Sequence, residues 1–119
     1  SRGLGDVYKR QLHNVLSDQG HVVALIKPQF EAGREQIGKK GIVKDKAIHE
    51  KVIQKVVDFA LDYGFTVKGL DFSPIQGGHG NIEFLAYLVK SQRPEGLAPQ
   101  TIQEVITKAH KEFEKHEKE

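Results

Sequence analysis

The most informative segment of the chain is His21–Glu31, HVVALIKPQFE. It contains an unbroken apolar run from Val22 to Ile26, followed at once by Lys27 and a proline. A short continuous apolar run is typical of a strand that is buried on both faces of a sheet. Because proline cannot continue a central strand, we expect Lys27 to lie where the strand emerges at the carboxyl edge of the sheet.

A second stretch, Gly77–Phe84, reads GGHGNIEF. It is a glycine-rich turn that opens another predicted strand, Ile82 to Val89, and it places Glu83 near the start of that strand. If the two strands are antiparallel, the end of the first meets the start of the second. The sequence therefore predicts that Lys27 faces Glu83. The glycines of the turn can cradle an anion, or they can simply allow a tight turn before the strand.

The remaining pattern predicts two strong helices and one more strand. Asp45 can cap an amphipathic helix that ends at Gly64, and the strand Phe65 to Phe72 follows. A final helix is expected to begin near Thr101, because Thr101 and Glu104 fit a capping box. The expected buried positions of the first helix share one stripe: Ile48, Val52, Ile53, Val56, Val57, Ala60 and Leu61.

The order of these elements predicts an α/β fold. A strand, a helix and a second strand form a right-handed crossover, and an immediate return strand would lie between the first two. The expected sheet is therefore a three-strand mixed sheet with a reversed last strand, plus helices. Leu12 to Asp18 is expected to be the end of a preceding helix capped by Gly20, and Phe30 to Lys44 is expected to be a long loop.

These strings, together with Gly33-Arg34-Glu35 and Gly41-Ile42-Val43, resemble the TlyA (hemolysin A) family from Leu12 to the end of the chain. The resemblance implies the carboxyl-terminal portion of a Rossmann-like, FtsJ-like domain. In that family the domain is an S-adenosylmethionine-dependent methyltransferase that acts on the ribose 2′-hydroxyl of cytidine in ribosomal RNA. The implied partners are ribosomal RNA or ribosomal subunits, with no membrane.

The family resemblance also implies catalytic residues. FtsJ-like enzymes use a Lys-Asp-Lys-Glu tetrad, in which Lys27 matches the second lysine and Glu83 matches the glutamate. A ribose hydroxyl must be aligned and must lose its proton as the new bond forms, and a lysine oriented by a carboxylate can steer that proton. The first lysine, the aspartate and the main cofactor site would precede Leu12. We therefore expect residues 12–119 to be a partial domain that is inactive alone.

Several other residues are candidates for substrate contact. Phe30, His79 and Asn81 are candidate neighbours of the substrate, although Phe30 could equally pack within the loop. His49 is expected on the helix surface, and neither it nor His79 argues for a metal site. Four basic residues of the long loop could bind RNA phosphates or could simply be solvated, namely Arg34, Lys39, Lys40 and Lys44.

Residues 1–11 are interpreted differently. Their sequence resembles a translated sequencing adapter, so we expect an artefactual leader, although an ordinary polar tail would also fit. This segment carries three basic residues and one acidic residue, which account for the whole formal net charge of +2. Overall charge therefore gives no support for nucleic-acid binding.

The composition indicates a cytoplasmic protein, because there is no cysteine for disulfides or thiolate zinc sites and no apolar run long enough to cross a bilayer. Two other functions remain open: a non-catalytic RNA-binding or ribosome-associated module, and a hemolysin-like activity. The sequence does not indicate the oligomeric state.

Overall fold

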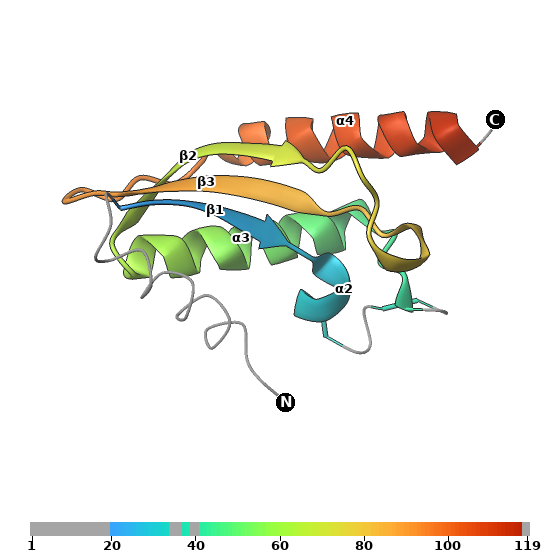
Figure 1. Cartoon of the computed structure of the whole chain (residues 1–119), viewed down its shortest axis with the longest axis horizontal. Coiled ribbons are helices and arrows are strands. Elements are labelled where there is room, and N and C mark those ends of the chain that lie inside the picture. The colour runs from blue at the N-terminus through green and yellow to red at the C-terminus, as the bar shows by residue number, and fades with distance from the viewer. Residues whose placement is uncertain (1–19, 34–36, 39–40, 118–119) are drawn as a thin grey trace.

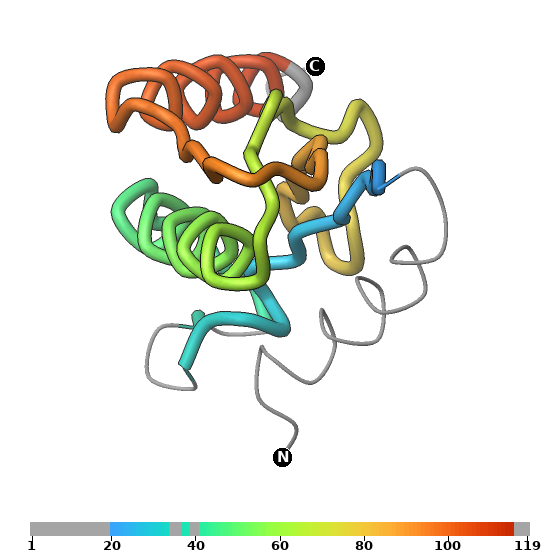
Figure 2. Tube along the Cα trace, turned by 90° about the vertical axis from the view of Figure 1, so that its left-hand side faces the viewer, coloured from blue at the N-terminus to red at the C-terminus, as the bar shows by residue number. Residues whose placement is uncertain are grey.

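The computed structural model describes residues 20–33, 37–38 and 41–117. In chain order the elements are β1 (His21–Ile26), α2 (Pro28–Glu31), α3 (Lys46–Asp62), β2 (Phe65–Phe72), the 3₁₀ turn η3 (Gly78–Gly80), β3 (Phe84–Lys90) and α4 (Pro99–Glu117). The three strands form one sheet, and α3 and α4 lie next to each other on the same side of it (Figures 1 and 2). The described part of the chain is therefore a two-layer α/β structure.

The strand order confirms the predicted topology. The sheet has the order β1-β3-β2, and β3 runs antiparallel to both neighbours. The register pairs Ile26 of β1 with Phe84 of β3, so the end of the first strand meets the start of the last. The predicted third strand began at Ile82, whereas β3 begins at Phe84, and Glu83 lies just before it.

One face of β1 is open, which contradicts the prediction that the strand is buried on both faces. Ala24 and Ile26 are buried, but the side chains between them are not: Val23 is 63% exposed and Leu25 is 37% exposed. The reason is that α3 and α4 cover only one face of the sheet within the described residues. The apolar run correctly predicted a strand but did not show which of its faces would be covered.

The helix α3 follows its predicted pattern closely. The Asp45 side chain accepts a hydrogen bond of 2.8 Å from the backbone N–H of Ala47, which is the expected N-terminal cap. Gly64, with φ of 88°, adopts the left-handed conformation typical of the residue that follows a helix. The expected surface position of His49 is wrong, because its side chain is completely buried.

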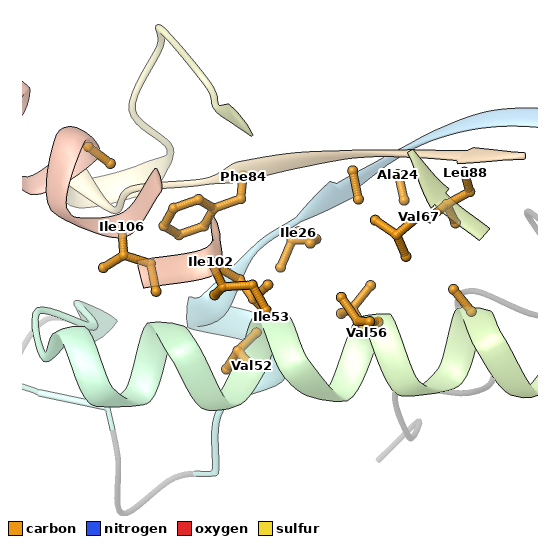
Figure 3. Packing of buried hydrophobic residues seen from close by; sticks show 14 of the residues in the cluster. Ala24, Ile26, Val52, Ile53, Val56, Val67, Phe84, Leu88, Ile102 and Ile106 are labelled. Carbon is orange, nitrogen blue, oxygen red and sulfur yellow. The ribbon is translucent and has the colours of Figure 1, made fainter. Parts of the chain in front are cut away.

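The core lies between the sheet and the two helices. Figure 3 shows Ile26 and Phe84 from the sheet packed with Ile53 from α3 and with Ile102 and Ile106 from α4, all of them buried. Side chains from the sheet and from both helices meet here, so the two helices hold the sheet in a fixed position. This packing fixes the sheet end where β1 finishes and β3 begins.

Two local predictions need correction. The final helix begins at Pro99, because proline is well suited to the first helical turn, and the N–H of Thr101 already bonds to the carbonyl of Ala98. Thr101 therefore does not cap the helix. The predicted loop after β1 starts with the short helix α2, in which Pro28 again occupies the first turn.

Some predictions concern residues outside the described part of the chain. These are the leader 1–11, the helix end at Leu12 to Asp18, and the basic residues Arg34, Lys39 and Lys40. No helix among the described residues is long and apolar enough to cross a membrane.

Candidate active site

Lys27 and Glu83 come together at one end of the sheet. Ile26 pairs with Phe84, so Lys27, which follows β1, and Glu83, which precedes β3, lie at the same end of the sheet. Both residues line a cavity of about 580 Å³, together with Gln29 and Phe30 of α2 and parts of the Gly77–Asn81 turn. A cavity of this size is in the range that holds a small ligand or one nucleotide unit. The two predicted tetrad residues thus share one cavity.

Lys27 and Glu83 have different surroundings within this cavity. The ammonium nitrogen of Lys27 lies 5.7 Å from the ring centroid of Phe30, a distance at which a cation is attracted to an aromatic face. Phe30 itself is 77% exposed, so its ring is available at the mouth of the cavity. Glu83 is buried, with 8% of its surface exposed.

Gln29 holds the Glu83 carboxylate. Its Nε2 donates a hydrogen bond of 2.7 Å to Oε2 of Glu83. Since a buried carboxylate without a partner is costly, this bond stabilises the charged side chain in its position. Gln29 stands in α2, whose first turn is closed by the N–H groups of Phe30 and Glu31 bonding to the carbonyl of Lys27. The short helix therefore places both Lys27 and the partner of Glu83.

Gly77 allows the close approach of the turn to Glu83. A Cβ atom on Gly77 would overlap Oε2 of Glu83 and would lie 3.0 Å from Nε2 of Gln29. Gly77 has an ordinary φ of −76°, so the requirement for glycine here is the lack of a side chain and not backbone freedom. The glycine turn therefore serves as one wall of the carboxylate site.

The rest of the turn is compact and internally bonded. The N–H of Gly77 donates to the carbonyl of Asn81 at 2.7 Å, and the N–H of Gly80 donates to the carbonyl of Gly77 at 3.1 Å. His79 has φ of 60°, a left-handed conformation that is uncommon for a residue other than glycine. The exposed imidazole of His79 lies beside the cavity of Lys27 and Glu83.

Asn81 connects the turn to the segment before α3. Its side chain, 2% exposed, accepts from the N–H of Val43 at 2.9 Å and donates to the carbonyls of Gly41 at 2.9 Å and Gly78 at 2.8 Å. These backbone partners use the amide oxygen and both amide hydrogens. Asn81 lines the cavity, and its amide holds two loops together.

His49 also contacts the segment before α3, at the carbonyl of Val43. Its Nε2 lies 3.0 Å from the carbonyl of Val43, and its Nδ1 lies 2.7 Å from Nε2 of His110 in α4. Burial, with the neighbouring His110 acting in the same direction, lowers the pKa of His49 from 6.5 to about 4. Burial also lowers the pKa of His110, with Lys46 acting in the same direction. Both imidazoles are therefore neutral at neutral pH.

A second cavity, of about 400 Å³, lies on the other side of the turn. His79 and Gly80 line it together with Lys44, His110 and Glu114. Lys44 is exposed here, and it is absent from the lining of the first cavity. Of the predicted basic patch, the described part of the chain thus contains only Lys44, next to the candidate active site and outside it.

The structure therefore brings Lys27, Glu83, Phe30, His79 and Asn81 to one cavity. Two functional positions were missed from the sequence. Gln29 was part of the quoted KPQFE string, but no pattern indicated that its amide would reach Glu83. His49 was expected at the surface because a histidine among charged residues resembles a surface position, although its spacing of three and four residues before Val52 and Ile53 places it on the buried stripe of α3. No group of three or more metal-ligating side chains was found among the described residues.

Such a sheet, with its last strand reversed between two strands that share one direction, agrees with the predicted carboxyl-terminal portion of a methyltransferase-type α/β domain. The FtsJ-like methyltransferase family matches residues 4–90, so the chain belongs to this family. The match starts within the predicted leader 1–11, whose interpretation stays a prediction.

Individual relatives agree with this assignment. The Bacillus subtilis (strain 168) protein named "Putative rRNA methyltransferase YqxC" is 46% identical over 103 residues, which cover 84% of this chain and 37% of that protein. The 16S/23S rRNA (cytidine-2′-O)-methyltransferase TlyA of Mycobacterium tuberculosis is 30% identical over 93 residues, covering 78% of this chain and 34% of TlyA. The chain thus spans about a third of the length of these relatives.

A solved structure shows the same fold. A protein described as "Putative hemolysin from Streptococcus thermophilus" superimposes with a TM-score of 0.80 and 67% identity, covering 86% of this chain and 37% of that one. At this level of identity the likeness extends to the sequence as well as the fold.

Proposed function

We propose that this chain provides the hydroxyl-activating half of a methyltransferase site that acts on the 2′-hydroxyl of cytidine in ribosomal RNA. The observation that carries the proposal is the convergence of Lys27 and Glu83 on one cavity, with Gln29 bonded to the carboxylate. The names of the relatives support the substrate class. Ribosomal RNA or ribosomal subunits are the proposed partners, and the cytoplasm is the proposed location.

The two side chains have separate tasks in this proposal. Lys27 steers the ribose hydroxyl and the proton that it loses, and Glu83 orients the lysine and the sugar. Phe30, exposed beside Lys27, offers a face on which a base can stack. His79 remains a proposed neighbour of the substrate at the rim of the cavity. Arg34, Lys39, Lys40 and Lys44 remain proposed contacts to RNA phosphates.

The proposed methyl donor is S-adenosylmethionine, which supplies an electrophilic methyl group when it is bound. The described residues do not form a cradle for it: β1 leads through Lys27 into a helix that starts with Pro28, whereas dinucleotide-type sites use a glycine-rich turn at this kind of position. We therefore assign no residue described here to the cofactor, and the proposal concerns only the hydroxyl side of the reaction.

A chimera tests the proposal with the residues of this chain. Residues 20–119 would replace the aligned segment of the Bacillus subtilis relative, and the product would be incubated with S-adenosylmethionine carrying a labelled methyl group and with ribosomal RNA from a strain lacking that relative. We expect labelled methyl groups on cytidine, seen as positions that resist alkaline cleavage because the 2′-oxygen is blocked.

The matched control is a chimera with Glu83→Gln, which preserves the size of the side chain but removes its charge. A folded chimera that binds the RNA and transfers no methyl group would contradict the proposal and favour the non-catalytic RNA-binding module. Labelling of bases in place of riboses would contradict the 2′-hydroxyl assignment.

A further inference from the structure

A chain of buried and partly buried hydrogen bonds connects α4 to the glycine turn beside Glu83. It begins at the pair of His110 and His49. Because the carbonyl of Val43 can only accept, Nε2 of His49 carries the proton and Nδ1 of His49 is the acceptor. Nε2 of His110 must therefore be the donor in the bond of 2.7 Å. Each nitrogen in the connection thus has a defined role.

The connection continues through Val43 to Asn81. The carbonyl of Val43 bonds to His49, and the N–H of the same residue bonds to Oδ1 of Asn81. The amide nitrogen of Asn81 then holds the carbonyl of Gly78 at 2.8 Å, inside the turn. Since the two bonds of Val43 are buried, water cannot easily replace them.

The turn held in this way is the one that confines the carboxylate. Gly78 follows Gly77, on which a Cβ would overlap Oε2 of Glu83, and the N–H of Gly77 is bonded to the backbone carbonyl of Asn81. A displacement of Asn81 would therefore displace the wall of the carboxylate site. Within the part of the chain that the structure describes, the side chains of His49 and Asn81 link α3 and the preceding segment to this wall.

We propose that His49 and Asn81 are positioning residues of the candidate active site, acting by holding the Gly77–Gly80 turn against Glu83. The proposal rests on the proposed function for its catalytic consequence. Neither residue needs to touch the reacting atoms: His49 fixes Val43, Asn81 joins Val43 to Gly78, and the turn sets the position of the Glu83 carboxylate.

NMR of backbone amides in the full 119-residue chain tests whether His49 and Asn81 hold the Gly77–Gly80 turn in place. In Asn81→Asp the side chain can still accept from Val43 but can no longer donate to Gly41 and Gly78. We expect the amide signals of Gly77, Gly78 and Gly80 to move. Gln54→Ala is the matched control, because it removes an exposed side-chain bond to Asp58 on α3, remote from the turn. Turn signals that stay at their wild-type positions in Asn81→Asp would overturn the proposal.

Two substitutions of His49 separate positioning from simple packing. Glutamine can donate to the Val43 carbonyl and accept from His110, whereas leucine fills similar space and can do neither. We expect His49→Gln to keep the turn signals close to wild type and His49→Leu to move them. Equal effects of the two variants would show that His49 acts by packing alone, and would overturn its positioning role.

The catalytic consequence is measured in the chimera described above. For Asn81→Asp we expect turnover on RNA to fall roughly tenfold or more, the scale expected for the loss of a buried hydrogen bond, with KM for the cofactor unchanged. Unchanged turnover despite a displaced turn would overturn the positioning role and leave the proposed function standing. An unmodified chimera without methyl transfer would count against the proposed function, whereas the amide signals would still decide whether the connection exists.

Discussion

The carboxylate of Glu83 occupies the space that a side chain on Gly77 would need. The neighbour of Gly77 is different, since a Cβ on Gly78 would meet no atom within 4 Å. Of these two adjacent glycines, Gly77 therefore has no room for a side chain, whereas Gly78 has. Because Gly77 has no side chain, the turn can lie close to the buried carboxylate of Glu83, which also bonds to Gln29.

Gly77→Ala should displace the Glu83 carboxylate and break its bond to Gln29. We expect a loss of about 1–3 kcal/mol in the free energy of unfolding, the usual cost of inserting a methyl group where there is no room. Urea denaturation of the 119-residue chain measures it. Gly78→Ala is the matched control and should change the free energy by much less. Equal losses in the two variants would contradict the close packing of Gly77 on Glu83.

Folding stability should depend on pH through His49. The pKa of its imidazole is 6.5 when unfolded and about 4 in the fold, so the unfolded chain binds more protons between these values. The contribution of His49 is therefore complete above pH 6.5 and is lost as the pH falls towards 4, by about 3 kcal/mol in total. The charged or titratable side chains acting on the pair are Asp45, Lys46, His110 and Glu114.

Unfolding free energies measured from pH 7 to pH 4 test this dependence. In His49→Gln the part of the slope due to His49 should disappear, while any contribution of His110, whose pKa burial also lowers, remains. A slope in His49→Gln equal to that of the unchanged chain would show that His49 is not the titrating group.

The open face of β1 should promote association of the chain with itself. Val23 and Leu25 are exposed there, next to Tyr87 of β3, which is 41% exposed. β1 is also an edge strand of the described sheet. Exposed apolar edge strands pair readily with other chains. We expect the 119-residue chain to form oligomers at higher concentration and Val23→Lys to reduce them.

Light scattering coupled to size-exclusion chromatography measures the association. Ala24→Lys is the control on the covered face, where the side chain is 1% exposed, and it should destabilise the fold instead. A chain that is monomeric and unfolds cooperatively, before any substitution, would contradict the expectation.

Much of the fold could be predicted from local patterns. Asp45 and Gly64 marked the ends of α3, because capping depends on residues that are neighbours in sequence. The order of the strands followed from the connection lengths, and the opposition of Lys27 and Glu83 followed from that order. These inferences needed only periodicity, turn residues and the rules for crossovers.

The features that could not be predicted depend on contacts between distant segments. His49 was expected at the surface because a polar residue on a helix is usually exposed, but Val43 and His110 supply two partners from other parts of the chain. The exposure of the Val23 side chain depends on which face of the sheet the helices cover, and the apolar run itself does not specify that face. Gln29 likewise gained its role only through the register that brings Glu83 close.

The proposed action of Lys27 on the ribose hydroxyl, at the site shared with Glu83, is tested by Lys27→Ala in the chimera. We predict that methyl transfer to RNA falls by about 100-fold or more, the usual range for losing a group that handles a proton, while the affinity for S-adenosylmethionine is unchanged. Lys68→Ala, an exposed lysine on β2, should leave both quantities unchanged. A Lys27→Ala chimera that keeps its rate, or that loses cofactor binding in step with activity, would contradict the claim.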